Sequence, residues 1–381
     1  MLLFLSQQIL EWSQGTEWVE RLSWLRIFRY ITVRTAGAAV TALLLSLWLG
    51  PKLIRWLKRL SFGETWDRVD HGPAALAQKS KQGTPTAGGL LIVLALSCST
   101  LLWAQMDNPL VDLTLLSVIV LCGLGFYDDY AKIAKGNAKG ATSRVKLAVQ
   151  TALALFIGLY LWQMPTTAPL VSDIMLPFYK YPVATGAAAL GILITVLTIV
   201  GSSNAVNLTD GLDGLAIGCT LIVGLVFLVM TYLAGNAKTA AYLFVPHVQG
   251  AGELTVFCAA LLGASLGFLW FNCHPAQMFM GDTGSLALGG ALGLVAVLIH
   301  QPFVLFIAGG VFVMEAGSVI IQTGYFKFSR WRYGAGRRVF LMTPIHHHFQ
   351  KRGWAETQVV ARFYILCVLC AVVALSTLKI R

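Results

Sequence analysis

The stretch 204-NAVNLTDGLDGLAIG-218 joins two long apolar runs of the chain, at about residues 183–201 and 212–233. Apolar runs of about 20 residues are typical of membrane-spanning helices. An aspartate at mid-membrane depth costs about 2.5–3.5 kcal/mol on insertion scales, so such groups without partners are unfavourable. The stretch therefore predicts a functional site at a helix boundary of a membrane protein. Its polar and acidic residues are Asn204, Asn207, Thr209, Asp210 and Asp213.

The amide and acidic residues of this stretch recur at every third position. Neighbouring pairs share a helix face, but the set drifts by about 60° per step, so the four side chains cannot form one straight stripe. Gly211 and Gly214 loosen the backbone there. The pattern favours a turn that directs these side chains inward.

The composition excludes an ordinary soluble domain. Hydrophobic residues make up 57% of the 381 residues and charged residues 12%, with a mean hydropathy of +0.71, whereas soluble domains carry about 25% charged residues. The seven cysteines lie mostly in apolar runs. Their odd number and their spacing favour buried thiols over a disulfide framework or a metal site. The basic residues behind the net charge of +11 lie in loops between the runs. This placement is typical of charges that orient a protein in the membrane and bind phosphate-bearing partners, and it does not favour nucleic-acid binding.

Ten apolar runs approach the length of a membrane span. The predicted fold is therefore an all-α polytopic integral membrane protein with ten transmembrane helices. Residues 1–31 predict an amphipathic N-terminal lead-in rather than a cleavable signal peptide, because acidic residues precede the basic ones. Residues 32–381 predict a single membrane domain. The runs lie at about 32–50, 86–104, 109–127, 145–163, 183–201, 212–233, 254–272, 285–300, 303–322 and 359–378.

Lysine and arginine are unevenly divided between the loops. The loops after the first, third and ninth runs contain seven, five and seven of these residues, when Lys146 at the start of the fourth run is counted with the third loop, and the four even-numbered loops contain only Lys180 and Lys238. Because basic residues are enriched in cytoplasmic loops, the odd-numbered loops are predicted to be cytoplasmic and both termini extracytoplasmic.

Five polar motifs fall on that same predicted cytoplasmic side. Oxygen ligands without thiolates suit a hard cation such as Mg²⁺, which takes one or two carboxylates and completes its shell with water and substrate phosphate. Aspartates beside many Lys and Arg residues therefore indicate a phosphate or diphosphate held between a metal and cations. The motifs are SKQGTPTAGG (80–89), GFYDDYAKI (125–133), NAVNLTDGLDGL (204–215), FNCHPAQMFMGDTGSLALGG (271–290) and MTPIHHHFQKRGW (342–354).

Single motifs have structural alternatives. Asp128 and Asp129 are adjacent, so on a helix they point about 100° apart and can be a pair solvated at the interface. Asp282 precedes a run of small residues, as an N-cap does. Thr84 or Thr86 can cap a turn that leads into a helix.

One interpretation of the three consecutive histidines at 346–348 is a site for a soft metal such as zinc. Consecutive side chains diverge on any regular backbone, however, and no acidic residue or cysteine adjoins them in the sequence. Hydrogen bonding or pairing with a substrate phosphate is favoured.

An ion-coupled transporter is the rival function. It needs ionisable residues near the bilayer midplane, but Glu315 is the only acidic residue well inside an apolar run. A lipid-binding scaffold without chemistry would not need so many carboxylates.

The five motifs, in this order and between about Thr32 and Thr377, resemble those of the polyprenyl-phosphate N-acetyl-hexosamine-1-phosphate transferases. One such motif is weak evidence, whereas five in order on a ten-span frame are specific. Two positions depart from the family pattern. Ala87 stands where members usually have methionine, which concerns packing. Gln350 stands where the histidine motif usually ends in glutamate, which removes a negative charge beside the substrate loop.

The resemblance implies a multi-pass enzyme of the bacterial plasma membrane with a cytoplasmic active site. Its expected reaction transfers phospho-N-acetylmuramoyl-pentapeptide from a UDP-linked donor to undecaprenyl phosphate, with Mg²⁺, giving lipid I and UMP for peptidoglycan synthesis. The alternative within the family transfers N-acetylglucosamine-1-phosphate from UDP-N-acetylglucosamine to the same lipid. Membrane lipid is a further partner and nucleic acid is not. The sequence leaves the oligomeric state open, a homodimer included.

The resemblance also assigns roles to residues. It implies catalytic roles for Asp128, Asp129, Asp282 and Lys132, and it places the metal on Asp282 and Asp128. Because a phosphate monoester has its second pKa near 6, the lipid phosphate is expected to attack the β-phosphate directly, with a two-step route through an aspartyl-phosphate as the alternative. Positions associated with nucleotide or substrate binding are Lys81, Thr86, Lys146, Asn207, Asp210, Asp213, Asn272, Phe279, Gln322, His346, His347 and His348.

Overall fold

The computed structural model describes residues 1–14, 18–60, 83–134 and 140–379. Every regular element in these residues is a helix, and an antiparallel bridge joins Ile174 and Ala184. The predicted all-α class is confirmed. The long helices are α3 (Ile31–Arg59), α5 (Gly89–Trp103), α6 (Pro109–Ala134), α7 (Ser143–Gln163), α9 (Ala188–Thr209), α10 (Leu215–Ala234), α12 (Ala251–Asn272), α13 (Gly281–Leu298), α15 (Gly310–Tyr333) and α17 (Glu356–Ser376).

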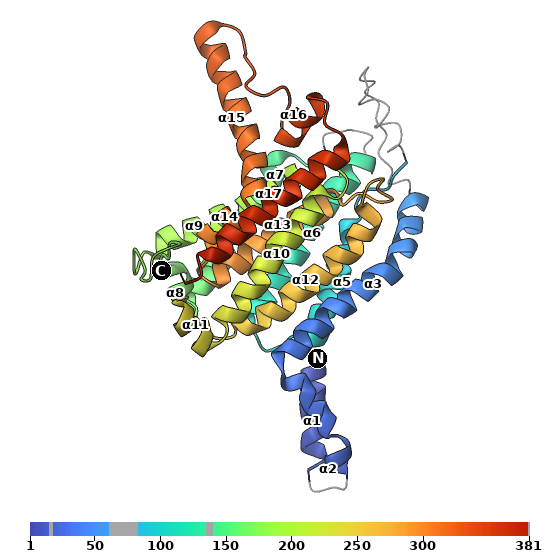
Figure 1. Cartoon of the computed structure of the whole chain (residues 1–381), viewed down its shortest axis with the longest axis vertical. Coiled ribbons are helices and arrows are strands. Elements are labelled where there is room, and N and C mark those ends of the chain that lie inside the picture. The colour runs from blue at the N-terminus through green and yellow to red at the C-terminus, as the bar shows by residue number, and fades with distance from the viewer. Residues whose placement is uncertain (15–17, 61–82, 135–139, 380–381) are drawn as a thin grey trace.

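Shorter helices precede and connect these. The residues before α3 form α1, α2 and the 3₁₀ helix η1, and α1 and α2 extend away from the bundle (Figure 1). The bounds of the short elements are α1 (Leu2–Trp12), α2 (Trp18–Arg21), η1 (Ser23–Arg29), α8 (Pro169–Ser172), α11 (Ala237–Leu243), α14 (Pro302–Ala308) and α16 (Ile345–Lys351).

Among the described residues, eight helices are long and apolar enough to cross a membrane. The pair α14 and α15 becomes a ninth if it is counted as one span, and α5 is shorter, with 15 residues. A polytopic membrane protein is thus confirmed, whereas the count of ten stays a prediction. The span expected at 303–322 is broken, because the chain bends by 84° between α14 and α15. The bend falls at the pair Gly309–Gly310, and glycine pairs are common sites of helix breaks.

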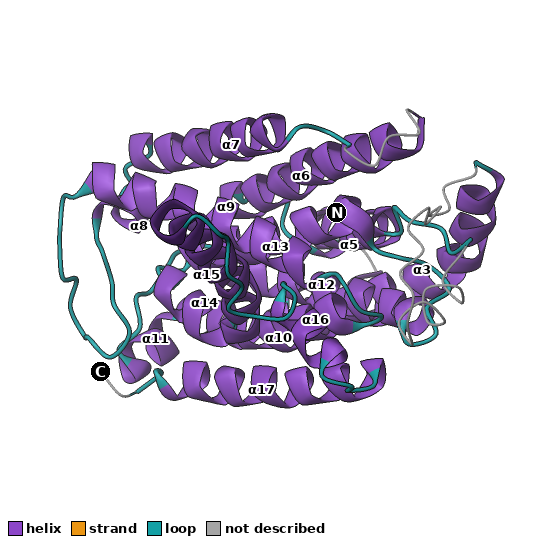
Figure 2. Cartoon of the chain, turned by 90° about the horizontal axis from the view of Figure 1, so that it is seen from above, coloured by secondary structure: helices purple, strands orange, loops and turns teal. Residues whose placement is uncertain are grey.

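α13 occupies the centre of the bundle, between α5, α6, α9 and α10 (Figure 2). Every residue from Thr283 to Leu298 is buried. Glycines let the neighbouring helices approach closely: a Cβ added at Gly289 would lie 2.4 Å from the backbone carbonyl oxygen of Ser202 on α9. The central position of α13 fixes its first turn, and with it Asp282, among the ends of the surrounding helices.

α3 packs along α12 through a seam of small residues. A Cβ added at Gly263 of α12 would lie 2.0 Å from the carbonyl oxygen of Ala39. Small residues spaced by four allow this approach because they form one continuous face of a helix. The buried small residues of α3 are Ala38, Ala42, Ser46 and Gly50.

The two ends of the bundle differ. α3 begins and α17 ends at the same end, where both chain termini lie (Figure 1). The opposite end carries α16 and the start of α17, and α15 projects beyond it (Figure 1).

Candidate active site

Two lysines bridge two aspartates at the end of the bundle that carries α16. Lys132 Nζ lies 2.7 Å from Asp128 Oδ2 and 3.3 Å from Asp282 Oδ1. Lys146 Nζ lies 2.9 Å from Asp128 Oδ1 and 2.5 Å from Asp282 Oδ2. Asp129 Oδ1 is 3.7 Å from Lys132 Nζ. These five residues, from α6, α7 and α13, are called the carboxylate–lysine cluster below.

Close helix packing brings the cluster together. Gly125 lies one turn before the aspartate pair on α6, and a Cβ there would lie 2.1 Å from the Asp282 carbonyl oxygen. Glycine at this position lets α6 contact the first turn of α13. The backbone N–H of Ala141 donates to Asp128 Oδ1 at 2.8 Å. Asp128 is therefore held between its own helix and the segment that leads into α7, with its side chain only 1% exposed.

Asp129 has a different environment from Asp128. Its Oδ2 accepts hydrogen bonds from the Thr283 hydroxyl at 2.6 Å and from the Thr283 N–H at 3.1 Å. Its Oδ1 accepts one from the Asp282 N–H at 3.3 Å. The first N–H groups of a helix lack partners within it and carry partial positive charge, so Asp129 caps α13 from a neighbouring helix. Thr86 adjoins this position, since a Cβ at Gly281 would lie 2.9 Å from its hydroxyl oxygen.

The last turn of α9 reaches α13 through the side-chain amide of Asn207. Asn207 Nδ2 donates to Ser285 Oγ at 3.0 Å, and Ser285 Oγ donates to the Gly281 carbonyl at 2.9 Å. Asp210 ends α9 as its C-cap and begins the segment 210–214, called the 210–214 turn below. The predicted turn in the opening stretch is thus present.

Asp213 belongs to a second group of ionisable residues. Its Oδ2 lies 3.0 Å from His274 Nδ1 and accepts a hydrogen bond from the Ala276 N–H at 3.2 Å. The backbone N–H of Asp213 donates to Glu356 Oε1 at 3.0 Å. Asp213 therefore ties the 210–214 turn to the loop before α13 and to the start of α17.

Asn272 and Phe279 hold the backbone around the site. Asn272 Oδ1 accepts a hydrogen bond from the Gly214 N–H at 3.1 Å. The Phe279 N–H donates to the Pro85 carbonyl at 2.8 Å, and the Phe279 carbonyl accepts from the Gly88 N–H at 2.8 Å. The first and fourth motifs are therefore joined through the main chain, and the third and fourth through the Asn272 side chain. Lys81 lies outside the described residues.

Gln322 contacts the loop that follows α15 and not the carboxylate–lysine cluster. Its Oε1 accepts hydrogen bonds from the N–H groups of Val339 and Phe340, both at 2.9 Å, and its Nε2 donates to the Phe340 carbonyl at 3.2 Å. Both ends of this amide hold the loop that follows α15. The structure does not bring Gln322 to the carboxylate–lysine cluster.

The three histidines have three separate partners. His346 is completely buried, with Nδ1 3.1 Å from Glu315 Oε2. His347 Nδ1 lies 2.8 Å from Gln350 Oε1. His348 Nδ1 accepts a hydrogen bond from the backbone of the loop after α15, at 3.1 Å. Because these nitrogens point to different groups, the histidines do not converge as a metal site.

The described residues contain two groups whose ligand atoms converge within 4.8 Å, as a metal site requires. One consists of Asp128, Asp129 and Asp282, and the other of Asp213, His274 and Glu356. The first fits a hard divalent cation, because all its donors are carboxylate oxygens. Asp128 Oδ2 is buried, and its 2.7 Å contact with Lys132 Nζ lacks hydrogen-bond geometry.

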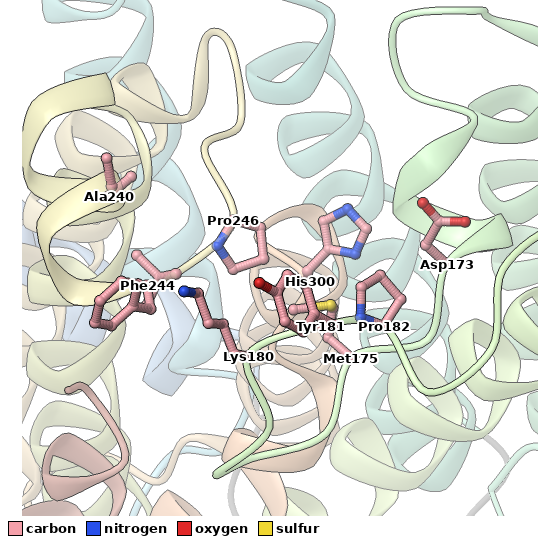
Figure 3. Close-up of a pocket in the computed structure, with 11 residues that line it drawn as sticks. Asp173, Met175, Lys180, Tyr181, Pro182, Ala240, Phe244, Pro246 and His300 are labelled. Atoms are coloured by element: carbon pink, nitrogen blue, oxygen red, sulfur yellow. The ribbon is translucent and has the colours of Figure 1, made fainter. Parts of the chain in front are cut away.

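A cavity of about 340 Å³ lies away from this site (Figure 3). His300, which lines it, follows the last turn of α13, whereas Asp282 lies in the first turn of that helix. Lys180, Tyr181, Phe244 and Pro246 also line it. None of the site residues predicted from the sequence does. The cavity and the carboxylate–lysine cluster therefore lie toward opposite ends of α13.

Several contacting residues were not predicted from the sequence. Glu315 gave a signal, because it is an acid inside an apolar run, but the sequence did not connect it with a histidine. Thr283, Ser285, His274 and Glu356 carried no signal of their own. Their importance depends on which helix ends meet.

Comparison with known proteins gives one consistent result. Residues 111–300 match the family described as Glycosyl transferase family 4. A phospho-N-acetylmuramoyl-pentapeptide-transferase of Desulfotalea psychrophila is 51% identical over 355 residues, covering 93% of this chain and 95% of that protein. Proteins of the same name from Syntrophus aciditrophicus and Methylacidiphilum infernorum are 48% and 47% identical, with 94% of this chain and 96% of each relative covered. The chain therefore belongs to the phospho-N-acetylmuramoyl-pentapeptide-transferase family.

Proposed function

We propose that this chain transfers phospho-N-acetylmuramoyl-pentapeptide from UDP to undecaprenyl phosphate, releasing UMP and forming lipid I. The carboxylate–lysine cluster carries the proposal, because it lies in a chain that is 51% identical to a phospho-N-acetylmuramoyl-pentapeptide-transferase. The names of the relatives favour this reaction over transfer of N-acetylglucosamine-1-phosphate.

The lipid phosphate needs little activation. Its second pKa is near 6, so most of it is dianionic at neutral pH. One of its oxygens attacks the β-phosphorus of the donor while the bond to the UMP oxygen breaks. The main barrier is repulsion between two anionic phosphates, and Lys132 and Lys146 offset this charge. Asp128 orients the incoming phosphate or accepts its residual proton.

Mg²⁺ is part of the proposal. Three carboxylates and two ammonium groups, when all are ionised, leave the cluster with one net negative charge, which favours binding of a divalent cation. Asp282 and Asp128 are the residues proposed to hold it, because Asp129 is engaged in capping α13. When bound, Mg²⁺ would neutralise charge on the diphosphate. Asp129 then acts by fixing the helix that carries Asp282.

The nucleotide site is proposed around the 210–214 turn. Asn207, Asp210 and Asp213 lie on or beside it, and Asn272 and Phe279 hold its neighbouring backbone. Residues proposed to bind nucleotide or substrate also include Lys81, Thr86, Gln322, His347 and His348. His346 is fully buried, so its proposed contribution is indirect.

The cellular setting is proposed from charge. The basic loops favour a cytoplasmic site and extracytoplasmic termini in the bacterial plasma membrane. We also propose that residues 1–31 form a lead-in, that residues 32–381 form a single domain, and that the protein is a homodimer. The mass of the purified protein in detergent tests the last of these.

Donor choice tests the reaction. Purified protein is supplied with undecaprenyl phosphate, Mg²⁺ and either UDP-N-acetylmuramoyl-pentapeptide or UDP-N-acetylglucosamine, and the ratio of the two kcat/KM values is measured. We expect lipid-linked product and UMP mainly from the muramoyl donor. Preference for UDP-N-acetylglucosamine would move the assignment to the sister transferase.

A further inference from the structure

Glu315 and His346 form a pair inside the protein. Glu315 lies on α15 and His346 on α16, and both side chains are 0% exposed, with Nδ1 and Oε2 3.1 Å apart. Within the described residues, neither carboxylate oxygen and neither ring nitrogen has a well-formed hydrogen bond. The two groups are therefore each other's main polar neighbours.

Burial makes each partner important to the other. A polar or charged group left without a partner in a protein interior is strongly unfavourable. Loss of either side chain would leave the other buried without its nearest polar neighbour.

The Nε2 edge of His346 faces the 210–214 turn. A Cβ added at Gly211 would lie 2.3 Å from His346 Nε2 and 2.8 Å from the adjacent ring carbon. No side chain separates the imidazole from the turn at this point. Glu315 therefore contacts His346, and His346 in turn packs directly against the backbone between Asp210 and Asp213.

We infer that Glu315 is a positioning residue for the transfer reaction. Through His346 it holds the 210–214 turn in the conformation that receives the UDP-linked donor. This inference rests on the proposed function for the identity of the donor. Its structural part, the hold on the turn, can be tested without any turnover.

A buried ion pair elsewhere in the chain offers a matched control. Arg34 and Glu253 are joined by two hydrogen bonds, of 2.5 and 2.6 Å, with side-chain exposures of 5% and 9%. Glu253 lies in the first turn of α12, whereas the last residue of α12 contacts the 210–214 turn. Its loss is expected to destabilise the protein without reaching the turn.

Hydrogen–deuterium exchange of the full chain in detergent compares Glu315→Gln with Glu253→Gln. We expect Glu315→Gln to speed exchange in peptides that cover 207–214 at least tenfold. It should also raise KM for UDP-N-acetylmuramoyl-pentapeptide at least fivefold, with kcat within twofold. Glu253→Gln should lower Tm and leave both readouts unchanged. Wild-type exchange of the turn in Glu315→Gln, or equally fast exchange in Glu253→Gln, would overturn the inference.

A second pair of variants applies if Glu315→Gln does not fold. Gly211→Ala alone should speed exchange in the turn, because the new methyl group displaces the imidazole. In a His346→Ala background, the same change should add less than twofold. Equal effects in both backgrounds would contradict the inference. If the wild-type protein shows no transfer, the proposed function fails while the exchange data still decide the positioning role.

Discussion

Asp129 accepts a hydrogen bond from the Thr283 hydroxyl at 2.6 Å, across the contact between α6 and α13. This bond separates the roles of two adjacent aspartates. Asp129 caps the helix that carries Asp282, and Asp128 faces Lys132 and Lys146. The two adjacent aspartates therefore have different surroundings on the same helix turn, Asp129 at the first turn of α13 and Asp128 between two lysines.

Thr283→Val removes that hydroxyl while keeping the shape of the side chain. Loss of a helix-capping interaction costs about 0.5–2 kcal/mol, so we expect a lower Tm and a slower turnover as Asp282 loses its fixed position. Thr220→Val is a suitable control, because among the described residues the Thr220 hydroxyl bonds only to the preceding turn of its own helix, at Ala216. Equal Tm values for the two variants would contradict the capping role.

The sequence predicted the helices and the meeting of the motifs, but not the pairing of side chains. Apolar runs fix helices because every spanning backbone must satisfy its own hydrogen bonds, and the parity of the runs places the five motifs at one end. The break at Gly309–Gly310 was missed, since glycine permits a bend without specifying one. The pairs Asp129–Thr283 and Glu315–His346 depend on helix packing, which the local sequence does not encode.

Cysteine accessibility tests the proposed orientation. Single cysteines replace Lys238 or Arg338 in a background without the seven native cysteines, because both positions are exposed and lie in the described residues. In intact cells, an impermeant thiol reagent should label Lys238→Cys and spare Arg338→Cys. Labelling of both after lysis is the control. The reverse pattern in intact cells would place the cluster on the wrong side for a cytoplasmic nucleotide.

His300 predicts a pH dependence of stability. Burial lowers the pKa of His300 from 6.5 to about 4, against the opposing effect of Asp173. Below pH 6.5 the unfolded chain therefore protonates this imidazole, whereas the folded chain does so only below about pH 4. Stability from this group is complete above the unfolded pKa and falls, by up to about 3 kcal/mol, as the pH drops between these values. Tm measured from pH 7 to pH 4.5 should decline less in His300→Gln, and parallel curves would refute the prediction.

Gln350→Glu tests the departure from the family pattern. Gln350 Oε1 lies 2.8 Å from His347 Nδ1, and glutamate can accept the same hydrogen bond. The added charge lies beside the exposed Lys351 and Arg352, where ion pairs contribute about 0–1 kcal/mol. We expect kcat to change by less than about fivefold and the muramoyl donor to stay preferred. A larger change would give the missing charge a direct part in catalysis.

The turnover rate of Asp282→Asn shows whether the charge of Asp282 is needed for the transfer reaction. Asparagine keeps the size of the side chain but removes the charge that meets both lysines and the proposed metal. Because each factor of ten in rate corresponds to about 1.4 kcal/mol, loss of a metal contact worth several kcal/mol should leave less than about a hundredth of the wild-type kcat. Asp112→Asn, in the first turn of α6, is the control and should keep the wild-type rate. A folded Asp282→Asn protein that retained more than a tenth of the wild-type kcat at saturating Mg²⁺ would contradict the account.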